Sequence, residues 1–225
     1  MASARYNAPV SAPRKKQIAG ALRLLEERYP AHPLRINRRT RPFRTLVSTL
    51  MSARTKDPVT VEATRRLFAE IATPRELLEL PESRIAELIY PVGFYKTKAR
   101  HLRELARILL ERFGGEVPQK REELMELPGV GRKTANLILS VAFGVPAICV
   151  DTHVHRISNR LGWVATDTVD ETEKALAKLL PRDKWAVINR VLVNHGQQTC
   201  HPTSPRCSEC LLAEICPRIG VTHRR

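Results

Sequence analysis

A glycine-rich segment followed by a lysine is the first candidate for chemistry in this chain of 225 residues. Residues 127–136 read LPGVGRKTAN, in which Gly129 and Gly131 are separated by one residue and Lys133 follows them. Glycines let backbone N–H groups approach a ligand closely, and the N-terminus of a following helix attracts an anion. The segment therefore predicts a hairpin that binds phosphate, with Lys133 as a phosphate contact or, when unprotonated, a nucleophile.

Cysteines form the second candidate site, because four of the five lie close to the C-terminus. Their spacing is C-x6-C-x2-C-x5-C, which is too crowded for a disulfide framework that spreads through a secreted fold. Four thiolates at such spacing suit a tetrahedral metal site, and the residue types alone leave zinc and iron–sulfur open. The predicted ligands are Cys200, Cys207, Cys210 and Cys216. Cys149, the fifth cysteine, is expected to be a small buried core residue.

The charge balance indicates a polyanionic partner. Lys and Arg number 38 against 23 Asp and Glu, which gives a formal net charge of +15. Residues 1–60 hold thirteen of the basic and three of the acidic residues, including a run of arginines from Arg35 to Arg44. A solvated basic face is the plainer interpretation of such a run, but the glycine hairpin favours nucleic acid.

Membrane and secretion signals are missing from the sequence. No apolar run approaches the length of about 18 residues that spans a bilayer, and the N-terminus lacks the hydrophobic stretch of a secretory signal. We therefore expect no membrane association and an intracellular protein. It is expected in the cytoplasm, on the nucleoid, if the source is bacterial or archaeal, and in the nucleus or mitochondrion if the source is eukaryotic.

Helical signals recur along the whole chain. Apolar residues follow the helical period over 102–113 and stop at Gly114, as at a helix C-cap. Thr73 and Thr168 are each followed three residues later by a glutamate, which predicts two capping boxes. Only residues 147–150, AICV, resemble a strand, so the fold class is predicted to be all-α. The other helices are expected near 17–28, 43–53, 59–71, 84–90, 132–143, 153–161 and 185–194.

Taken together, several motifs resemble the endonuclease III group of the helix-hairpin-helix DNA glycosylases. They are LMSARTKD at 50–57, LPGVGRKTAN at 127–136, VDTHVHR at 150–156 and the C-terminal cysteines. The likeness runs from about residue 18 to residue 218.

The resemblance implies a two-lobed helix-hairpin-helix DNA glycosylase fold. A basic N-terminal arm over 1–16 would precede a six-helix barrel lobe over 37–145. Residues 17–36 and 146–225 would together form a discontinuous lobe that carries an iron–sulfur cluster. The four C-terminal cysteines would hold this cluster, of the 4Fe-4S type.

The resemblance also implies roles for individual residues. Lys133 would attack C1′ of a nucleotide turned out of the duplex and form a Schiff base. Asp151 would assist displacement of the base, although its sequence context taken alone favours a helix N-cap. The remaining hairpin residues would bind DNA: Gly129, Gly131, Arg132 and Thr134.

Two residues depart from the family's usual pattern, at the place where side chains fill the hole left by the extruded nucleotide. Arg54 stands where a Gln is usual and would favour an opposing guanine, whereas Phe94 stands where a Leu is common and offers a larger stacking surface. Ser52 and Asp57 match positions of the lesion pocket, and His153 matches a DNA-contacting position. Taken alone, Asp57 is more commonly a surface helix cap, and His153 is more commonly a core histidine.

The sequence therefore predicts a bifunctional DNA glycosylase and AP lyase of base excision repair. It would act as a monomer on double-stranded damaged DNA, remove oxidised or reduced pyrimidines through a lysine Schiff base, and cut the strand by β-elimination. The alternatives are a pyrimidine-dimer or mismatch glycosylase of the same superfamily and a non-catalytic DNA-binding module. A metallohydrolase that uses Asp151, His153 and His155 as ligands is a further alternative, but alternate residues on a helix face apart.

Overall fold

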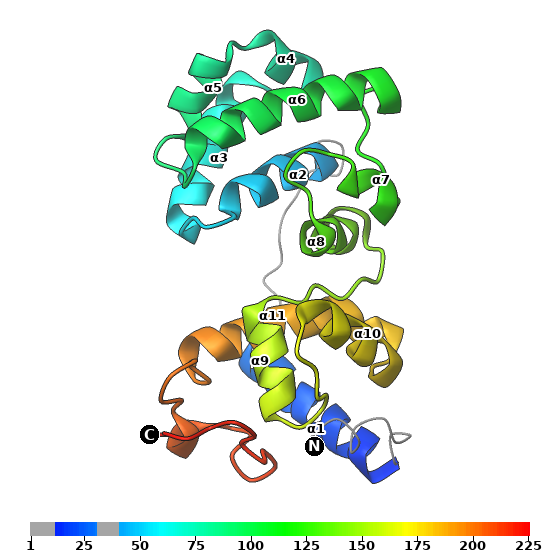
Figure 1. Ribbon diagram of the computed structural model, residues 1–225, viewed down its shortest axis with the longest axis vertical. Coiled ribbons are helices and arrows are strands. Elements are labelled where there is room, and N and C mark those ends of the chain that lie inside the picture. The colour runs from blue at the N-terminus through cyan, green and yellow to red at the C-terminus, as the bar shows by residue number, and fades with distance from the viewer. Residues whose placement is uncertain (1–11, 31–40) are drawn as a thin grey trace. The chain divides into compact units, whose positions relative to one another are not determined.

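The computed structural model describes residues 12–30 and 41–225, and the regular secondary structure of these residues is helical. These residues contain helices and turns but no strand (Figure 1), which confirms the all-α prediction. The AICV run at 147–150 belongs to a loop between two helices. Residues 1–11 of the predicted arm, the arginines at 35, 38 and 39, and the predicted lobe boundary between 36 and 37 lie outside the described residues.

The described residues divide into two compact units. Residues 41 to Val145 form the first, which we call the hairpin unit. Residues 12–30 and Pro146–Arg225 form the second, which we call the cysteine unit. The chain therefore begins in the cysteine unit, forms the whole hairpin unit, and then completes the cysteine unit.

The hairpin unit is a layered arrangement of helices in which the long helix α6 lies against α4 and α5, and α2 lies against α3 and α8 (Figure 1). Its apolar side chains are buried where these helices meet, for example Leu105 of α6, Leu77 of α4 and Leu46 of α2. The α2–α8 contact fixes the helix that begins at the glycine hairpin. The helices are α2 (Arg41–Ser52), α3 (Asp57–Glu70), α4 (Pro74–Glu79), α5 (Glu82–Ile89), α6 (Tyr95–Phe113), α7 (Arg121–Met125) and α8 (Arg132–Phe143).

Several helix boundaries coincide with capping residues that the sequence predicts. Thr73 and Thr168 both form the predicted capping boxes, each with the glutamate three residues on. Gly114 ends α6 in the left-handed conformation, with φ of 60°. The start of α6 differs from the prediction, because the helix begins at Tyr95 rather than near residue 102. Its first turn is largely polar, so apolar periodicity could not reveal it.

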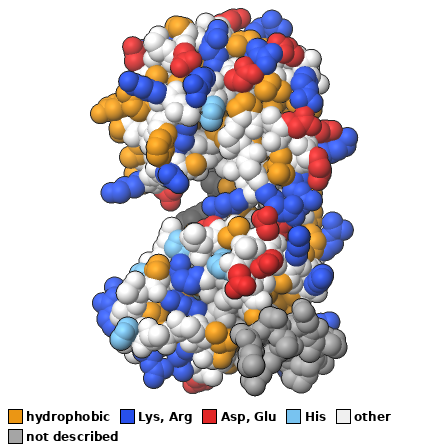
Figure 2. Space-filling view, viewed as in Figure 1, with side chains coloured by type: hydrophobic (Ala, Val, Ile, Leu, Met, Phe, Trp, Pro, Cys, Tyr) orange, Lys and Arg blue, Asp and Glu red, His pale blue; other side chains and the backbone are white. Residues whose placement is uncertain are grey.

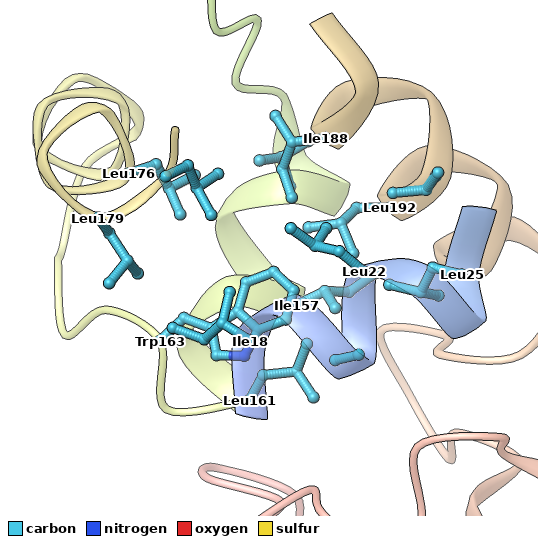
Figure 3. Close-up of a cluster of buried hydrophobic side chains, with 14 of the residues drawn as sticks. Ile18, Leu22, Leu25, Ile157, Leu161, Trp163, Leu176, Leu179, Ile188 and Leu192 are labelled. Carbon is cyan, nitrogen blue, oxygen red and sulfur yellow. The ribbon is translucent and has the colours of Figure 1, made fainter. Parts of the chain in front are cut away.

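The cysteine unit has its own hydrophobic core, in which α1 packs against α11 and α9 contacts both α10 and α11. Leu22 of α1, Ile157 of α9 and Ile188 of α11 all belong to this core (Figure 3). Helix α1 begins at Ala12, so the last residues of the predicted arm are helical. The elements are α1 (Ala12–Arg28), α9 (Thr152–Arg160), α10 (Val169–Leu179), η2 (Arg182–Lys184), α11 (Trp185–Gln198) and η3 (Cys207–Glu209).

Candidate active site and metal centre

The glycine hairpin lies between α7 and α8, and the structure requires glycine at only one of its two glycine positions. Gly129 has a φ of 78°, and a Cβ there would lie 3.2 Å from Leu50 Cδ2 and 3.3 Å from His101 Nδ1. Gly131 has an ordinary φ of −91°, and a Cβ there would meet no described atom within 4 Å. The fold therefore requires glycine at position 129, because of its positive φ and its close neighbours. A side chain at position 131 would occupy only the space in front of the hairpin.

Lys133 lies on the first turn of α8, as predicted from the sequence. The N-cap of this helix is Gly131, and no side chain caps it. Lys133 is exposed, while Asn136, Ile138 and Leu139 on the same helix are buried. The lysine therefore stands beside the hairpin on the outer face of α8, next to the half-buried Arg132 and Thr134.

Asp151 is the N-cap of α9, which confirms the capping prediction. Its Oδ1 atom accepts hydrogen bonds from the backbone N–H groups of His153 and Val154, both at 2.9 Å. The residue is half-buried and has extended backbone geometry, as an N-cap requires. Two bonds to its own helix thus fix the orientation of this carboxylate.

His153 and His155 face different neighbours within the cysteine unit. His153 Nδ1 lies 3.1 Å from Arg156 Nη2, and its ring packs so closely on α11 that a Cβ at Gly196 would lie 2.3 Å away. His155 Nδ1 lies 2.7 Å from the hydroxyl of Thr172 on α10. Because the two imidazoles point to different helices, they cannot share a metal ion, and the metallohydrolase alternative is not supported.

Arg54 and Phe94 come together although forty residues separate them in the sequence. The Arg54 guanidinium carbon lies 5.6 Å from the centroid of the Phe94 ring, a cation–π contact. Both side chains are exposed, and both residues are in the left-handed region, with φ of 54° and 57°. They therefore form one protruding pair on two adjacent loops.

Ser52 and Asp57 flank this pair on the α2–α3 connection. The Ser52 hydroxyl donates to the carbonyl of Thr49 at 2.8 Å, so it is bonded within its own helix. Asp57 is exposed at the first position of α3, where its carboxylate favours the helix N-terminus. These contacts agree with a helix-end role for Asp57, and no described contact assigns either residue to a pocket.

The four C-terminal cysteines line one small cavity of about 30 Å³ in the cysteine unit. Burial raises the pKa of the Cys210 and Cys216 thiols, and the neighbouring cysteines raise it further. Within the described residues, no three or more His, Cys, Asp or Glu side chains are arranged to hold a metal ion. The thiols therefore converge on a common space without forming a coordination shell. Cys149 is buried in the core, as predicted, and it does not line this cavity.

Two buried residues that the sequence did not single out face the cysteine sulfurs. Arg160 Nη1 donates to Cys200 Sγ at 3.4 Å, and the same guanidinium donates to the carbonyls of His201 and Pro202 at 2.6 and 2.7 Å. His195 Nε2 lies 3.6 Å from Cys210 Sγ, and burial lowers the pKa of His195 to about 4. The buried Arg160 guanidinium beside the sulfurs suits thiolates that carry negative charge.

No helix among the described residues is long and apolar enough to cross a membrane.

A family model described as "HhH-GPD superfamily base excision DNA repair protein" matches residues 47–182. This range contains the hairpin, Lys133 and Asp151. Fold and site together thus define a helix-hairpin-helix protein of base excision repair.

Individual relatives narrow this class. The chain is 50% identical to endonuclease III of Thermotoga maritima over 86% of this chain and 89% of that protein. A solved structure of a trapped endonuclease III–DNA covalent intermediate matches with a TM-score of 0.82 and 40% identity, over 91% of this chain and 96% of the other. A thermostable thymine-DNA glycosylase matches with a TM-score of 0.78 and 27% identity, over 92% and 98%.

The chain belongs to the endonuclease III family. It is accordingly an enzyme of base excision repair, a DNA glycosylase and AP lyase.

Proposed function

We propose that the enzyme removes oxidised or reduced pyrimidines from duplex DNA and then cuts the strand at the abasic site, with Lys133 as the nucleophile. The observation that carries this proposal is the exposed Lys133 on the first turn of α8, directly after the glycine hairpin. A hairpin that binds the phosphates beside the lesion would bring the lysine amine next to the sugar. The trapped covalent complex of a related endonuclease III supports the same reaction type.

The proposed reaction begins at C1′ of the extruded nucleotide. The unprotonated Lys133 amine forms a bond to C1′ while the glycosidic bond breaks, and the departing base takes up a proton. Opening of the sugar ring then gives a Schiff base. Loss of a proton from C2′ breaks the C3′–O3′ bond by β-elimination, so the strand is cut on the 3′ side, and water finally releases the lysine.

Asp151 is proposed to assist these steps through its carboxylate. It would stabilise the positive charge that develops on the sugar or accept the proton of the attacking amine, and it would help the later proton transfers. Its fixed N-cap geometry supports the proposal, because a carboxylate that is already oriented loses little entropy in the transition state.

The hairpin and the basic surface are proposed to bind the DNA backbone. On the face seen in Figure 2, Lys and Arg side chains are spread over both units with Asp and Glu among them. The net charge of +15 therefore attracts DNA without defining where it binds. Gly129, Gly131, Arg132 and Thr134 would supply the local phosphate contacts, and His153 a further contact from α9.

Arg54 and Phe94 are proposed to fill the hole that the extruded nucleotide leaves in the duplex. Their exposure and mutual contact on one protruding edge support this role. The guanidinium fork of Arg54 would favour guanine as the opposing base. Replacing Arg54 by Gln should flatten the preference among the four opposing bases, and equal activity of both proteins on all four would contradict it. Ser52 and Asp57 would border the lesion pocket.

A 4Fe-4S cluster is proposed as the resident cofactor, held by Cys200, Cys207, Cys210 and Cys216. The residues fit, because four thiols face one cavity and the buried Arg160 offsets the charge of their thiolates. The bound cluster would hold the C-terminal loop in shape and would take no part in the base chemistry. Iron analysis of the purified enzyme should give about four iron atoms per chain, and Cys216→Ser should lower this content.

The partner is proposed to be damaged double-stranded DNA, bound by a monomer. A light-scattering mass near the 25.5 kDa of the chain, with and without DNA, would support the monomer. The enzyme would work where the genome lies, in the bacterial or archaeal cytoplasm or in the eukaryotic nucleus or mitochondrion.

Borohydride trapping tests the central proposal. Duplexes that contain thymine glycol, an abasic site or undamaged thymine are incubated with wild type, Lys133→Gln or the exposed control Lys96→Gln. A covalent adduct on the damaged duplexes, lost in Lys133→Gln and retained in the control, is the expected result. DNA binding by the wild type without any adduct would instead indicate a monofunctional glycosylase or a binding module.

The thymine-DNA glycosylase among the solved structures makes a mismatch glycosylase the second candidate. Its identity to this chain is 27%, against 40% for the endonuclease III complex. An amine nucleophile at position 133 favours a lyase over a mismatch enzyme, which needs none. Excision of thymine from a G·T mismatch without a trapped adduct would favour the second candidate.

A further inference from the structure

The two loops that carry Arg54 and Phe94 are joined by close backbone contacts. The Gly93 N–H donates to the Thr55 hydroxyl at 3.1 Å. A Cβ at Gly93 would lie 2.5 Å from the carbonyl oxygen of Arg54, so only glycine allows this approach. The α2–α3 loop and the α5–α6 loop therefore form one structural piece.

Lys98, on the first turn of α6, is bonded to the end of α2 and to the α2–α3 loop. Its Nζ donates to the carbonyls of Met51 and Ala53 at 2.8 and 2.5 Å, and it lies 3.4 Å from the Thr55 hydroxyl. An ammonium group has three donors, and three oxygens of one short segment surround it. The Met51 carbonyl belongs to the last turn of α2, where a cation is favoured by the helix dipole.

A direct contact with DNA does not account for the placement of this lysine. Its donors are directed at protein oxygens, and the side chain is only partly exposed. Burial also lowers the pKa of Lys98, because the charged ammonium is partly removed from water. By contrast, Lys96 on the same turn is exposed and makes no such contacts with the α2–α3 loop among the described residues. Lys98 thus binds oxygens of the α2–α3 segment rather than DNA.

The conformations of the pair show why such a tether is needed. Arg54 and Phe94 both have positive φ, which side chains with a Cβ seldom adopt unless surrounding contacts impose it. Without the ammonium, the carbonyls of Met51 and Ala53 would lose their donor, and the loop between them and Thr55 could relax. The exposed pair would then no longer project as one unit.

We propose that Lys98 is a positioning residue for nucleotide extrusion, because it fixes the loops of Arg54 and Phe94 as a single rigid edge. This inference rests on the proposed function, in which the pair fills the hole left in the duplex. Extruding a stacked base depends on such an edge more than extruding an abasic sugar does, because the abasic sugar has no base to unstack. A loss of Lys98 should therefore affect the two substrates unequally.

The test compares Lys98→Met with Lys96→Met, which removes an equal charge from the same turn. Single-turnover base release from a thymine glycol duplex is measured beside cleavage of a preformed abasic duplex. For Lys98→Met we expect base release to fall about tenfold to a hundredfold, and abasic cleavage to fall by less than about threefold. The Lys96→Met variant should lower both rates by a similar small factor.

A second variant keeps the test decisive if Lys98→Met folds poorly. Thr55→Val removes the hydroxyl that contacts both Gly93 and Lys98 while leaving the side-chain volume unchanged. It should give the same unequal loss, but a smaller one, with an unchanged melting temperature. Equal losses on both substrates, or no loss on either, in the folded variants would overturn the role of Lys98. Wild type that acts on neither substrate would instead overturn the proposed function.

Discussion

The N-termini of α8 and α9 carry the two residues proposed for the chemistry, yet they are built in opposite ways. Helix α8 has Gly131 as its N-cap, and no side chain caps it. Helix α9 has Asp151 as its N-cap, and the carboxylate accepts two backbone N–H groups of its own helix. Both ends have the partial positive charge of a helix N-terminus. The N-terminus of α8 leaves this partial charge at the front of the hairpin, whereas the N-terminus of α9 binds the carboxylate of Asp151.

The difference shows how one local device can serve two purposes. At α8, a glycine cap keeps side-chain bulk away from the helix end, where the proposed function places a phosphate. At α9, the helix end orients a functional group of the protein itself, which makes Asp151 both a cap and a candidate for catalysis. Substitutions that separate these two purposes test the comparison directly.

The largest effect is expected at Asp151. Asn keeps an oxygen that can accept the two N–H bonds but removes the negative charge, so base release should fall about 10²-fold to 10⁴-fold while stability changes little. Ala should lower activity as much and also reduce the unfolding free energy by about 1 kcal/mol, because the cap is lost. Single-turnover kinetics and thermal denaturation measure the two effects. An active Asn variant would leave Asp151 with the capping role alone.

A smaller effect is expected at the two hairpin glycines, and the two should differ. Gly131→Ala should leave the unfolding free energy within about 0.5 kcal/mol but weaken binding of a duplex with a stable abasic analogue about tenfold. Gly129→Ala should also destabilise the fold, by about 1–2 kcal/mol, because its φ of 78° is unfavourable for alanine. Fluorescence anisotropy and denaturant unfolding measure these quantities. Equal stability losses in both variants would contradict the distinction drawn between the glycines.

The smallest effect is expected at Arg132, the first residue of α8. Replacing it with Gln should reduce the slope of log K against log salt by about 0.9, as for one lost phosphate contact. Arg65→Gln is the matched control, because Arg65 is paired with Glu62 on the surface of α3 and should leave the slope unchanged. Identical slopes for wild type and Arg132→Gln would remove Arg132 from the proposed interface.

Local signals in the sequence predicted much of this structure. Four features could be predicted because each depends on residues within one or two helical turns. They are the helical class, the capping boxes at Thr73 and Thr168, the N-cap at Asp151 and the C-cap at Gly114. The hairpin and the grouped cysteines were readable for the same reason, since their spacing brings their members together without help from the rest of the chain.

Contacts between distant segments were decided only by the tertiary structure. Lys98 meets the carbonyl of Met51 across 47 residues, Arg160 meets the Cys200 sulfur across 40, and Arg54 meets Phe94 across two loops. In the sequence, Lys98 and Arg160 look like ordinary basic surface residues, and nothing local shows that Arg54 and Phe94 contact each other. Only helix packing brings the partners together. For Lys98 and Arg160 the physical reason is burial, because an ammonium or guanidinium group that is partly or fully removed from water needs hydrogen-bond acceptors from the fold.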